Sequence, residues 1–193
     1  MDLVKFEMTA AFIGARTSLT WREVLFGLEN ELLAPRAVVA VAVDRLAAEP
    51  APLPALVELA GRGAWEWSRD LVEQLAATEP ERAPGSVRAK WLYLVLSWVF
   101  EHRQMFSDPL QTVEEVYADF DYPEEMAPFV RYMPGTAPDS GSKEANESRL
   151  YERWKSYLGE MGKAYGNETQ PTQREPTDGA GRAEHREPTD VGR

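Results

Sequence analysis

The longest apolar run of this chain, WLYLVLSWVF at residues 91–100, places the strongest constraint on its fold. A helix of this length spans about 15 Å, which is half the thickness of a bilayer core. Lys90 and Glu101 close the run at its two ends. A helix that is apolar on every side and too short to cross a membrane must be buried in protein. We therefore predict a central core helix over residues 86–106.

The signals on both sides of this run also indicate helices. Thr20 and Glu23 have the spacing of a capping box, which predicts a helix over residues 20–33. Pro35 fits the first position of the next helix. Only residues 3–8 show the alternation typical of a strand. We predict an all-α fold, a single compact domain of about six to eight helices, with further helices at residues 56–59, 65–77, 109–120, 123–128 and 147–161.

Two of these helices carry features with a specific expected geometry. Asp108 fits an N-cap, followed by a proline and by a capping-box glutamine, Gln111. Trp65 and Trp67 are two residues apart in the helix predicted at 65–77, so they should point to different faces. We expect one of these tryptophans in the core and the other partly exposed. The core stripe expected after Asp108 is Leu110, Val113, Tyr117 and Phe120.

The composition changes sharply near the end of the chain. Residues 166–193 contain no aromatic residue, and the pentapeptide REPTD occurs at 174–178 and again at 186–190. Such a segment cannot bury enough apolar area to offset its ordering entropy. We predict a helical domain over residues 1–165 and a disordered tail over residues 166–193. The repeat favours a duplicated low-complexity tail over a bivalent peptide motif.

Charge and cysteine usage restrict the partners and the compartment. The formal net charge of −11 makes free nucleic acid and anionic membranes poor partners and basic proteins good ones. The absence of cysteine leaves no disulfide framework and no thiolate metal site, which fits a reducing compartment. The first residues lack the pattern of a secretory signal. We expect a cytoplasmic protein that binds neither nucleic acid nor membrane.

Catalytic motifs are missing from the chain. It has no Gly-x-Ser-x-Gly elbow, no glycine-rich phosphate loop and no His-x-x-x-His pair. Its two histidines are His102, which we interpret as a helix cap or an interfacial residue, and His185 in the predicted tail. Residues 119–125 cluster oxygen ligands but lack the glycine and the spacing of an EF-hand loop. We therefore predict no enzymatic activity, no bound metal and no cofactor.

The most unusual composition lies in residues 108–134, which hold seven carboxylates, five aromatic residues and a single basic residue, Arg131. Acids without neighbouring bases repel one another, so such a segment needs internal partners or a positively charged ligand. We predict that it recognises a basic protein, with the acids steering and pairing with the partner and a tyrosine anchoring it. The predicted partner-binding residues are Glu114, Glu115, Asp119, Asp121, Tyr122, Glu124, Glu125 and Tyr132.

Some of these acids have an alternative role within the fold. Lys90, Arg103 or Arg131 can neutralise Asp119 and Asp121 internally. The spacing of residues 121–124 also fits a capping box in which Asp121 caps the following helix. For the four glutamates, the alternative is a plain solvated face. If Asp119 and Asp121 are neutralised internally, the remaining candidate binding surface consists of the Glu114–Glu115 and Glu124–Glu125 pairs with one or two adjacent tyrosines.

Several segments resemble a known family. They are KWLYL at residues 90–94, FSDPL at 106–110, VEEVYADFDYP at 113–123 and FVRYMP at 129–134, with LTW at 19–21 near the start. Together they resemble the bacterial domain-of-unknown-function family 2247, over residues 6–154 and without the tail. The family has no established activity, so the resemblance implies no catalytic residue. Small acidic bacterial proteins of this kind are often similar to immunity proteins, which sit beside a secreted toxin and block it.

Three functional hypotheses follow. The first is an acidic, monomeric protein-binding module, an immunity protein that neutralises a toxin by occlusion, with a basic nuclease as one candidate target. The second is a helical scaffold or regulatory domain that pairs with itself or with another helical protein through its tryptophan-bearing surfaces. The third is a metal-dependent hydrolase built on carboxylates. The first agrees best with the acids and aromatics of residues 108–134.

Overall fold

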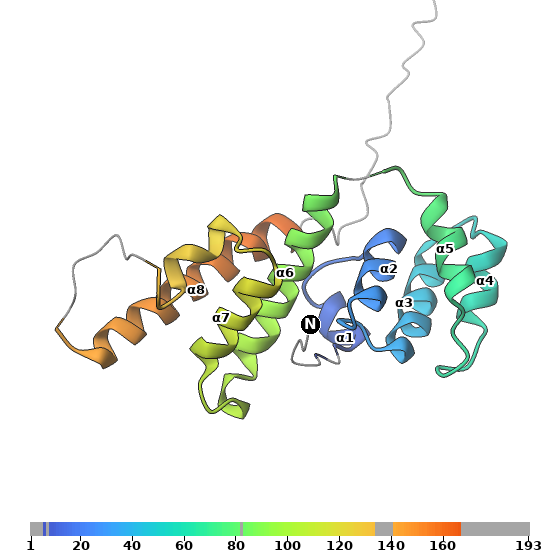
Figure 1. The fold of residues 1–193 in the computed structure, drawn as a ribbon. Helices are drawn as coiled ribbons and strands as arrows, with labels where there is room; N and C mark the ends of the chain where they lie inside the picture. The colour runs from blue at the N-terminus through green and yellow to red at the C-terminus, as the bar shows by residue number, and fades with distance from the viewer. Residues whose placement is uncertain (1–5, 7, 82, 134–140, 167–193) are drawn as a thin grey trace, which may run out of the picture.

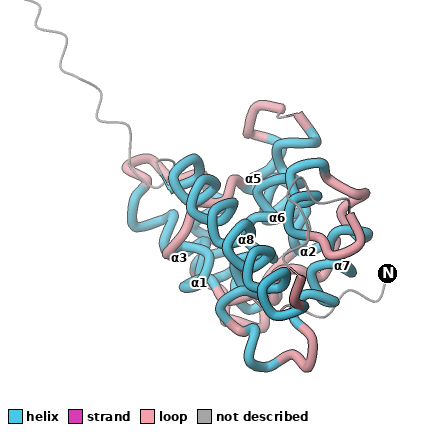
Figure 2. Tube along the Cα trace, turned by 90° about the vertical axis from the view of Figure 1, so that its left-hand side faces the viewer, coloured by secondary structure: helices cyan, strands magenta, loops and turns pink. Residues whose placement is uncertain are grey.

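The computed structural model describes residues 6, 8–81, 83–133 and 141–166. These residues form α-helices and short 3-10 helices without any strand, and an isolated bridge joins Met8 to Leu33 (Figure 2). The predicted all-α class is confirmed. Residues 3–5 and 7 of the predicted strand and residues 167–193 of the predicted tail lie outside this range. The elements are α1 Ala10–Gly14, α2 Trp21–Glu29, α3 Pro35–Ala48, α4 Pro54–Ala60, α5 Arg69–Ala77, α6 Pro84–Glu101, η1 Arg103–Met105, α7 Pro109–Asp119, η2 Glu124–Phe129 and α8 Lys143–Gly166.

Helix α6 lies in the middle of the molecule, as predicted from its apolar run. It contacts α2 on one side and α7 and α8 on the other, and Figure 1 shows it between these two groups of helices. Its side chains are buried all round the helix axis, including Trp91, Leu92 and Leu94. It ends at Glu101 rather than at residue 106: His102 is its C-cap, and the chain continues as η1.

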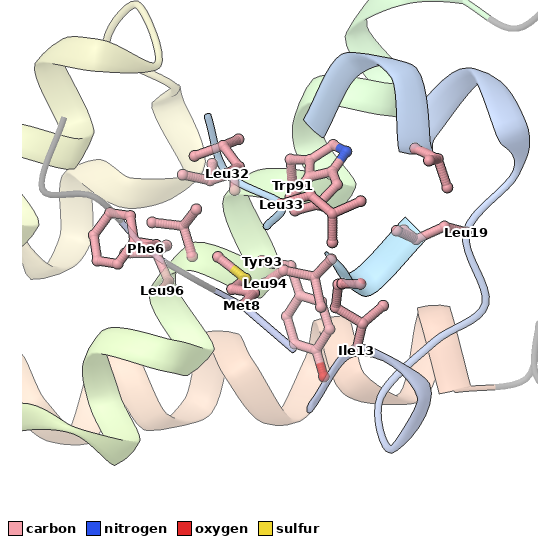
Figure 3. Close-up of a cluster of buried hydrophobic side chains, with 14 of the residues drawn as sticks. Phe6, Met8, Ile13, Leu19, Leu32, Leu33, Trp91, Tyr93, Leu94 and Leu96 are labelled. Atoms are coloured by element: carbon pink, nitrogen blue, oxygen red, sulfur yellow. The ribbon is translucent and has the colours of Figure 1, made fainter. Parts of the chain in front are cut away.

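The core around α6 draws on segments that are far apart in the sequence. Figure 3 shows side chains from the start of the chain and from the segment after α2 gathered around the buried face of α6. The isolated bridge between Met8 and Leu33 brings these two segments side by side. The members labelled in the figure are Phe6, Met8, Ile13, Leu19, Leu32, Leu33, Trp91, Tyr93, Leu94 and Leu96.

The start of α2 is capped twice. The predicted capping box is confirmed: Thr20 Oγ1 accepts from the Glu23 N–H, and Glu23 Oε2 accepts from the Thr20 N–H at 2.7 Å. The carboxylate of Glu79, from the loop after α5, also accepts the Trp21 N–H at 2.8 Å and the Arg22 N–H at 3.0 Å. Two carboxylates therefore satisfy backbone donors that the first helical turn leaves unpaired.

The end of α2 comes earlier than predicted. The helix stops at Glu29 instead of continuing to residue 33. Glu31 adopts a positive φ of 55°, and the N–H groups of Leu32 and Leu33 both donate to the carbonyl of Gly27. This turn redirects the chain so that both leucines enter the core, and the burial of their side chains outweighs continued helix formation.

The helix predicted at residues 65–77 begins only at Arg69, so both tryptophans lie in the loop between α4 and α5. A turn in which the Glu66 N–H donates to the Gly63 carbonyl at 2.8 Å holds this loop. Trp67 packs against the core, whereas Trp65 is 80 % exposed. One tryptophan is thus packed and the other exposed, as expected, but both lie in a loop rather than in a helix.

A buried ion pair joins α2 to α6. Lys90 Nζ lies 2.9 Å from Glu23 Oε1 and 3.0 Å from Glu23 Oε2, and both side chains are almost completely buried. Lys90 also donates to the carbonyl of Ser18, and Trp91 Nε1 donates to the carbonyl of Glu23 at 2.9 Å. Lys90 is therefore an interior residue that connects the two helices through Glu23.

The C-terminal elements differ from their predictions mainly in length. The stripe expected on α7 is buried as predicted. Residues 124–129 form a 3-10 helix, because Pro128 cannot donate an α-helical hydrogen bond. Helix α8 has 24 residues, more than the predicted 147–161, and its fully buried Trp154 packs on Phe100 and Phe129.

In the described part of the chain, no helix combines the length and the apolar character that crossing a membrane requires.

Candidate functional site

Three tyrosines form a cluster where α7 meets the segments on both sides of η2. Tyr117 on α7 is buried, with 4 % of its surface exposed. The ring of Tyr122 packs edge-on against it at 5.2 Å, and the ring of Tyr132 lies tilted at 6.1 Å. Tyr122 and Tyr132 are 62 % and 57 % exposed. This tyrosine cluster (Tyr117, Tyr122 and Tyr132) therefore presents two aromatic rings to solvent on a buried support.

The backbone that presents Tyr122 is strained. Asp121 and Tyr122 have φ values of +61° and +57°, a left-handed conformation that costs non-glycine residues on the order of 1 kcal/mol or more each. The Tyr122 N–H donates to the Tyr117 carbonyl at 2.8 Å, and the Asp121 N–H donates to the Ala118 carbonyl at 3.2 Å. These bonds close the C-terminus of α7 and hold Tyr122 in its exposed position.

Arg131 binds two of the acids within the fold. Its Nη1 lies 2.7 Å from Asp108 Oδ2, and its Nε and Nη2 donate to the two oxygens of Glu114 at 2.8 and 3.2 Å. The carboxylate of Asp108 also accepts the N–H groups of Leu110 and Gln111, as its predicted role of N-cap requires. Hydrogen bonds from Arg131 and from these amides lower the pKa of Asp108, and the two acids raise the pKa of Arg131.

Arg88 on α6 binds one further acid, Asp121. Its Nη1 lies 2.7 Å from Asp121 Oδ2, and its Nη2 donates to the backbone carbonyl of Asp119 at 2.9 Å. The predicted capping of the following helix by Asp121 is wrong, because its carboxylate pairs with Arg88 and η2 begins after Pro123 without a side-chain cap. Arg103, another predicted neutraliser, donates to the carbonyl of Phe100 instead.

The remaining acids face solvent. Glu115, Glu124 and Glu125 are exposed, and within the described ranges none of them forms an ion pair with a basic side chain. Glu115 accepts a hydrogen bond from Gln111 Nε2 at 3.2 Å. The predicted capping-box role of Gln111 is wrong, because the cap of α7 consists of the bonds that the Asp108 carboxylate accepts. Burial raises the pKa of Tyr157 on α8, and the charge of Glu125 raises it further.

These exposed and half-buried acids lie in the part of the chain that carries the family resemblance. A sequence model of an uncharacterised protein family conserved in bacteria, DUF2247, matches residues 10–162. The chain belongs to the DUF2247 family. No curated protein and no solved structure matches it. The matched range runs from α1 into α8 and includes the whole tyrosine cluster.

The predicted partner-binding residues of this DUF2247 chain lie in two settings. Glu114 and Asp119 are half-buried on α7, and the other six are exposed on α7, η2 and the flanking turns. Sequence reasoning missed Arg88, which pairs with Asp121. The spacing of Arg88, Trp91 and Val95 places Arg88 on a core-facing side of α6. This periodicity could have identified Arg88 as an internal partner of the acids.

In the described part of this DUF2247 chain, no three histidine, aspartate or glutamate side chains are arranged to hold a metal ion. His102, the one histidine that the structure describes, stacks on Trp98 at 4.1 Å. Its Nδ1 lies 2.8 Å from the Trp98 carbonyl. This contact agrees with its predicted role at the end of a helix.

The Asp108–Arg131 pair should make the stability of the folded chain depend on pH. Because the folded-state pKa of Asp108 is lowered, the pair contributes stability above the ordinary carboxyl pKa, and this contribution is lost as the pH falls through the folded value. A ¹³C NMR titration of the side-chain carboxyl should show Asp108 titrating below ordinary aspartates. In an Arg131→Gln variant its pKa should rise toward the ordinary value. An Asp108 pKa that Arg131→Gln leaves unchanged would show that the ion pair does not form in solution.

Proposed function

We propose that this DUF2247 chain binds a basic protein through its tyrosine cluster and the acids around it. We further propose that the partner is a toxin, neutralised by occlusion as immunity proteins do. The observation that carries the proposal is the pair of exposed rings, Tyr122 and Tyr132, held on the buried ring of Tyr117. Exposed tyrosines on a rigid support lose little conformational entropy on binding and are typical interface hot spots.

The charges around the cluster support the same partner class. Arg131 and Arg88 compensate Asp108, Glu114 and Asp121, whereas Glu115, Glu124 and Glu125 remain exposed. Exposed rim charges mainly accelerate association with a partner of opposite charge, and buried aromatic contacts mainly slow dissociation. A basic surface would therefore be steered by the three glutamates and held by the two tyrosines.

The proposal is tested by searching the neighbouring genes for a toxin-like domain and by measuring its binding to Tyr122→Ala and Tyr132→Ala, separately and together. Each single variant should weaken binding about tenfold or more, since interface tyrosines contribute on the order of 2 kcal/mol. The measurement is calorimetric affinity, together with protection of cells that express the toxin-like domain. Trp65→Ala, which removes an exposed aromatic residue from the distant α4–α5 loop, is the matched control and should bind normally. Full binding by the double tyrosine variant would exclude this surface as the interface.

The steering role of the acids is tested separately. A triple variant with Glu115, Glu124 and Glu125 changed to glutamine should associate more slowly, and its association rate should depend less on salt. Its dissociation rate should change little. A fast, salt-dependent association that survives in the triple variant would contradict the steering role.

A second function, self-association, is favoured by a different observation. Several of the large exposed apolar side chains in the described residues lie on or beside α3 and α4: Val43, Leu53, Val57 and Trp65. Exposed apolar side chains on neighbouring elements are typical of interaction surfaces. Light scattering after size-exclusion chromatography distinguishes the two functions, because a tight homodimer that Trp65→Ala dissociates supports a scaffold, and a monomer supports the toxin-binding module.

A further inference from the structure

A cavity of about 200 Å³ opens where α2, α6 and α7 meet, beside the turn that carries Tyr122. Its apolar walls come from Phe26 and Leu32, at and after the end of α2, and from Phe120, the residue that follows α7. Its polar lining consists of Asn30, Arg88, Asp119 and Asp121. Concave sites with apolar walls and a few converging polar groups are typical of ligand recognition.

The charges of this cavity favour a cation. Arg88 contributes one positive charge, and Asp119 and Asp121 contribute two negative charges, which leaves a net charge of −1. Arg88 already pairs with Asp121, donates to the carbonyl of Asp119 and lies 5.7 Å from the ring centroid of Phe120. An anion would therefore compete with an existing ion pair, whereas a single positive charge would neutralise the site.

Two acceptors in the cavity remain open within the described part of the chain. The half-buried carboxylate of Asp119 accepts no hydrogen bond and forms no ion pair with a described residue. Asn30 donates its Nδ2 hydrogen to the carbonyl of Phe26 at 2.8 Å, which leaves its Oδ1 as an acceptor. Burial raises the pKa of Asp119, the positive charge of the chain's N-terminus lowers it by a smaller amount, and Glu115, one helical turn earlier, raises it. A desolvated carboxylate without a donor is stabilised by any cation that reaches it.

We propose that this cavity receives one arginine side chain of the protein partner. The guanidinium would bind both oxygens of Asp119, and its alkyl stem would pack on Phe26 and Leu32. Arginine fits better than lysine because a planar guanidinium matches a carboxylate bidentately and stacks on aromatic walls. The inference rests on the proposed function, since it names the partner residue that binds beside Tyr122.

The experiment uses Nα-acetyl-arginine amide as the probe, titrated into the ¹⁵N-labelled full chain and followed by NMR. The expected result is a saturable shift of the Asn30, Phe120 and Asp121 amides, with Nα-acetyl-lysine amide binding more weakly. Asp119→Asn should weaken the affinity for the probe about tenfold, because it removes a charge-assisted bidentate bond. Asp70→Asn, which makes the same change at an exposed acid on α5, is the matched control and should bind the probe normally.

The variant is expected to fold. Asparagine has the shape of aspartate, and the raised pKa of Asp119 means that its charged form is less favourable in the folded chain than in the unfolded one at neutral pH. The thermal midpoint of Asp119→Asn should therefore equal or exceed that of the unchanged chain. Shifts that spread over the whole acidic surface, or that Asp119→Asn leaves unchanged, would overturn the inference.

The failure of this inference can be separated from the failure of the proposed function. If the tyrosine variants lose the toxin-like partner while Asp119→Asn binds it normally, the cavity receives no partner side chain and the proposed function stands. If the arginine probe binds in an Asp119-dependent manner but no basic partner binds, the cavity site stands and the proposed function fails.

Discussion

Replacing Lys90 by methionine is expected to lower the free energy of unfolding by about 3–5 kcal/mol, because it leaves the carboxylate of Glu23 buried without its cation. Lys90 contacts both oxygens of Glu23 at 2.9 and 3.0 Å, and both side chains are almost completely buried. Methionine keeps most of the volume of lysine, so the loss measures charge rather than packing. Urea unfolding, followed by tryptophan fluorescence, gives the free energy directly.

A matched variant separates the ion pair from the other roles of Glu23. Combining Lys90→Met with Glu23→Gln should recover a large part of the loss, because the neutral amide keeps an acceptor for the Thr20 N–H without burying a charge. The surface pair of Arg62 and Glu58 is the control, and Arg62→Met should change stability by less than about 1 kcal/mol. If Lys90→Met cost no more than this control, the buried pair would have no role in joining α2 to α6.

The helices that the sequence predicted well are those with strong local signals. The apolar run of residues 91–100 predicted the central position of α6, because a helix without a polar face must be covered on all sides. The capping box predicted the start of α2, because its two hydrogen bonds lie within four residues. Helix ends were predicted less well. The early end of α2 depends on the burial of Leu32 and Leu33 against distant segments, which no local pattern encodes.

Contacts between distant residues explain the main errors. Glu23 and Lys90 are 67 residues apart, and the position of Lys90 at the end of an apolar run resembles that of a solvent-exposed flanking charge. The spacing of Asp121 fitted a capping box, but Arg88 on another helix binds its carboxylate. In both cases the residue type and the local spacing were read correctly, and the partner came from elsewhere in the fold.

The candidate site, like the fold, was predicted in its local features but not in its contacts between distant residues. The sequence identified the acidic and aromatic segment. It also predicted Arg131 as an internal partner of Asp119 and Asp121, but Arg131 pairs with Asp108 and Glu114 instead. It could not separate the acids bound by arginines from the exposed ones. That separation leaves Glu115, Glu124 and Glu125 beside two exposed tyrosines, and it leaves Asp119 in a cavity with no described cation on its carboxylate. The function proposed above depends on this division of the acids.

Gly27→Ala is expected to destabilise the chain by about 3 kcal/mol, the upper end of the usual cost of overpacking a core. Gly27 lies in α2 directly against Trp91, and a Cβ at this position would lie 2.1 Å from Trp91 Cζ2 and 2.6 Å from Cη2. Trp91 cannot move aside easily, because it is fully buried and its Nε1 donates to the carbonyl of Glu23. The clash should therefore exceed the gain of about 1 kcal/mol that alanine brings to a helix interior.

A glycine-to-alanine substitution at a position with free space should stabilise the chain instead. Gly159 lies in the interior of α8, and a Cβ at this position would meet no atom within 4 Å. Gly159→Ala should therefore stabilise the chain by about 0.5–1 kcal/mol through helix propensity alone. A double-mutant cycle assigns the loss at Gly27 to the indole: in a Trp91→Phe background, the smaller ring should reduce the cost of Gly27→Ala by at least about 1 kcal/mol. If the cost were the same in both backgrounds, the close contact between α2 and the Trp91 ring would not explain why glycine is required at residue 27.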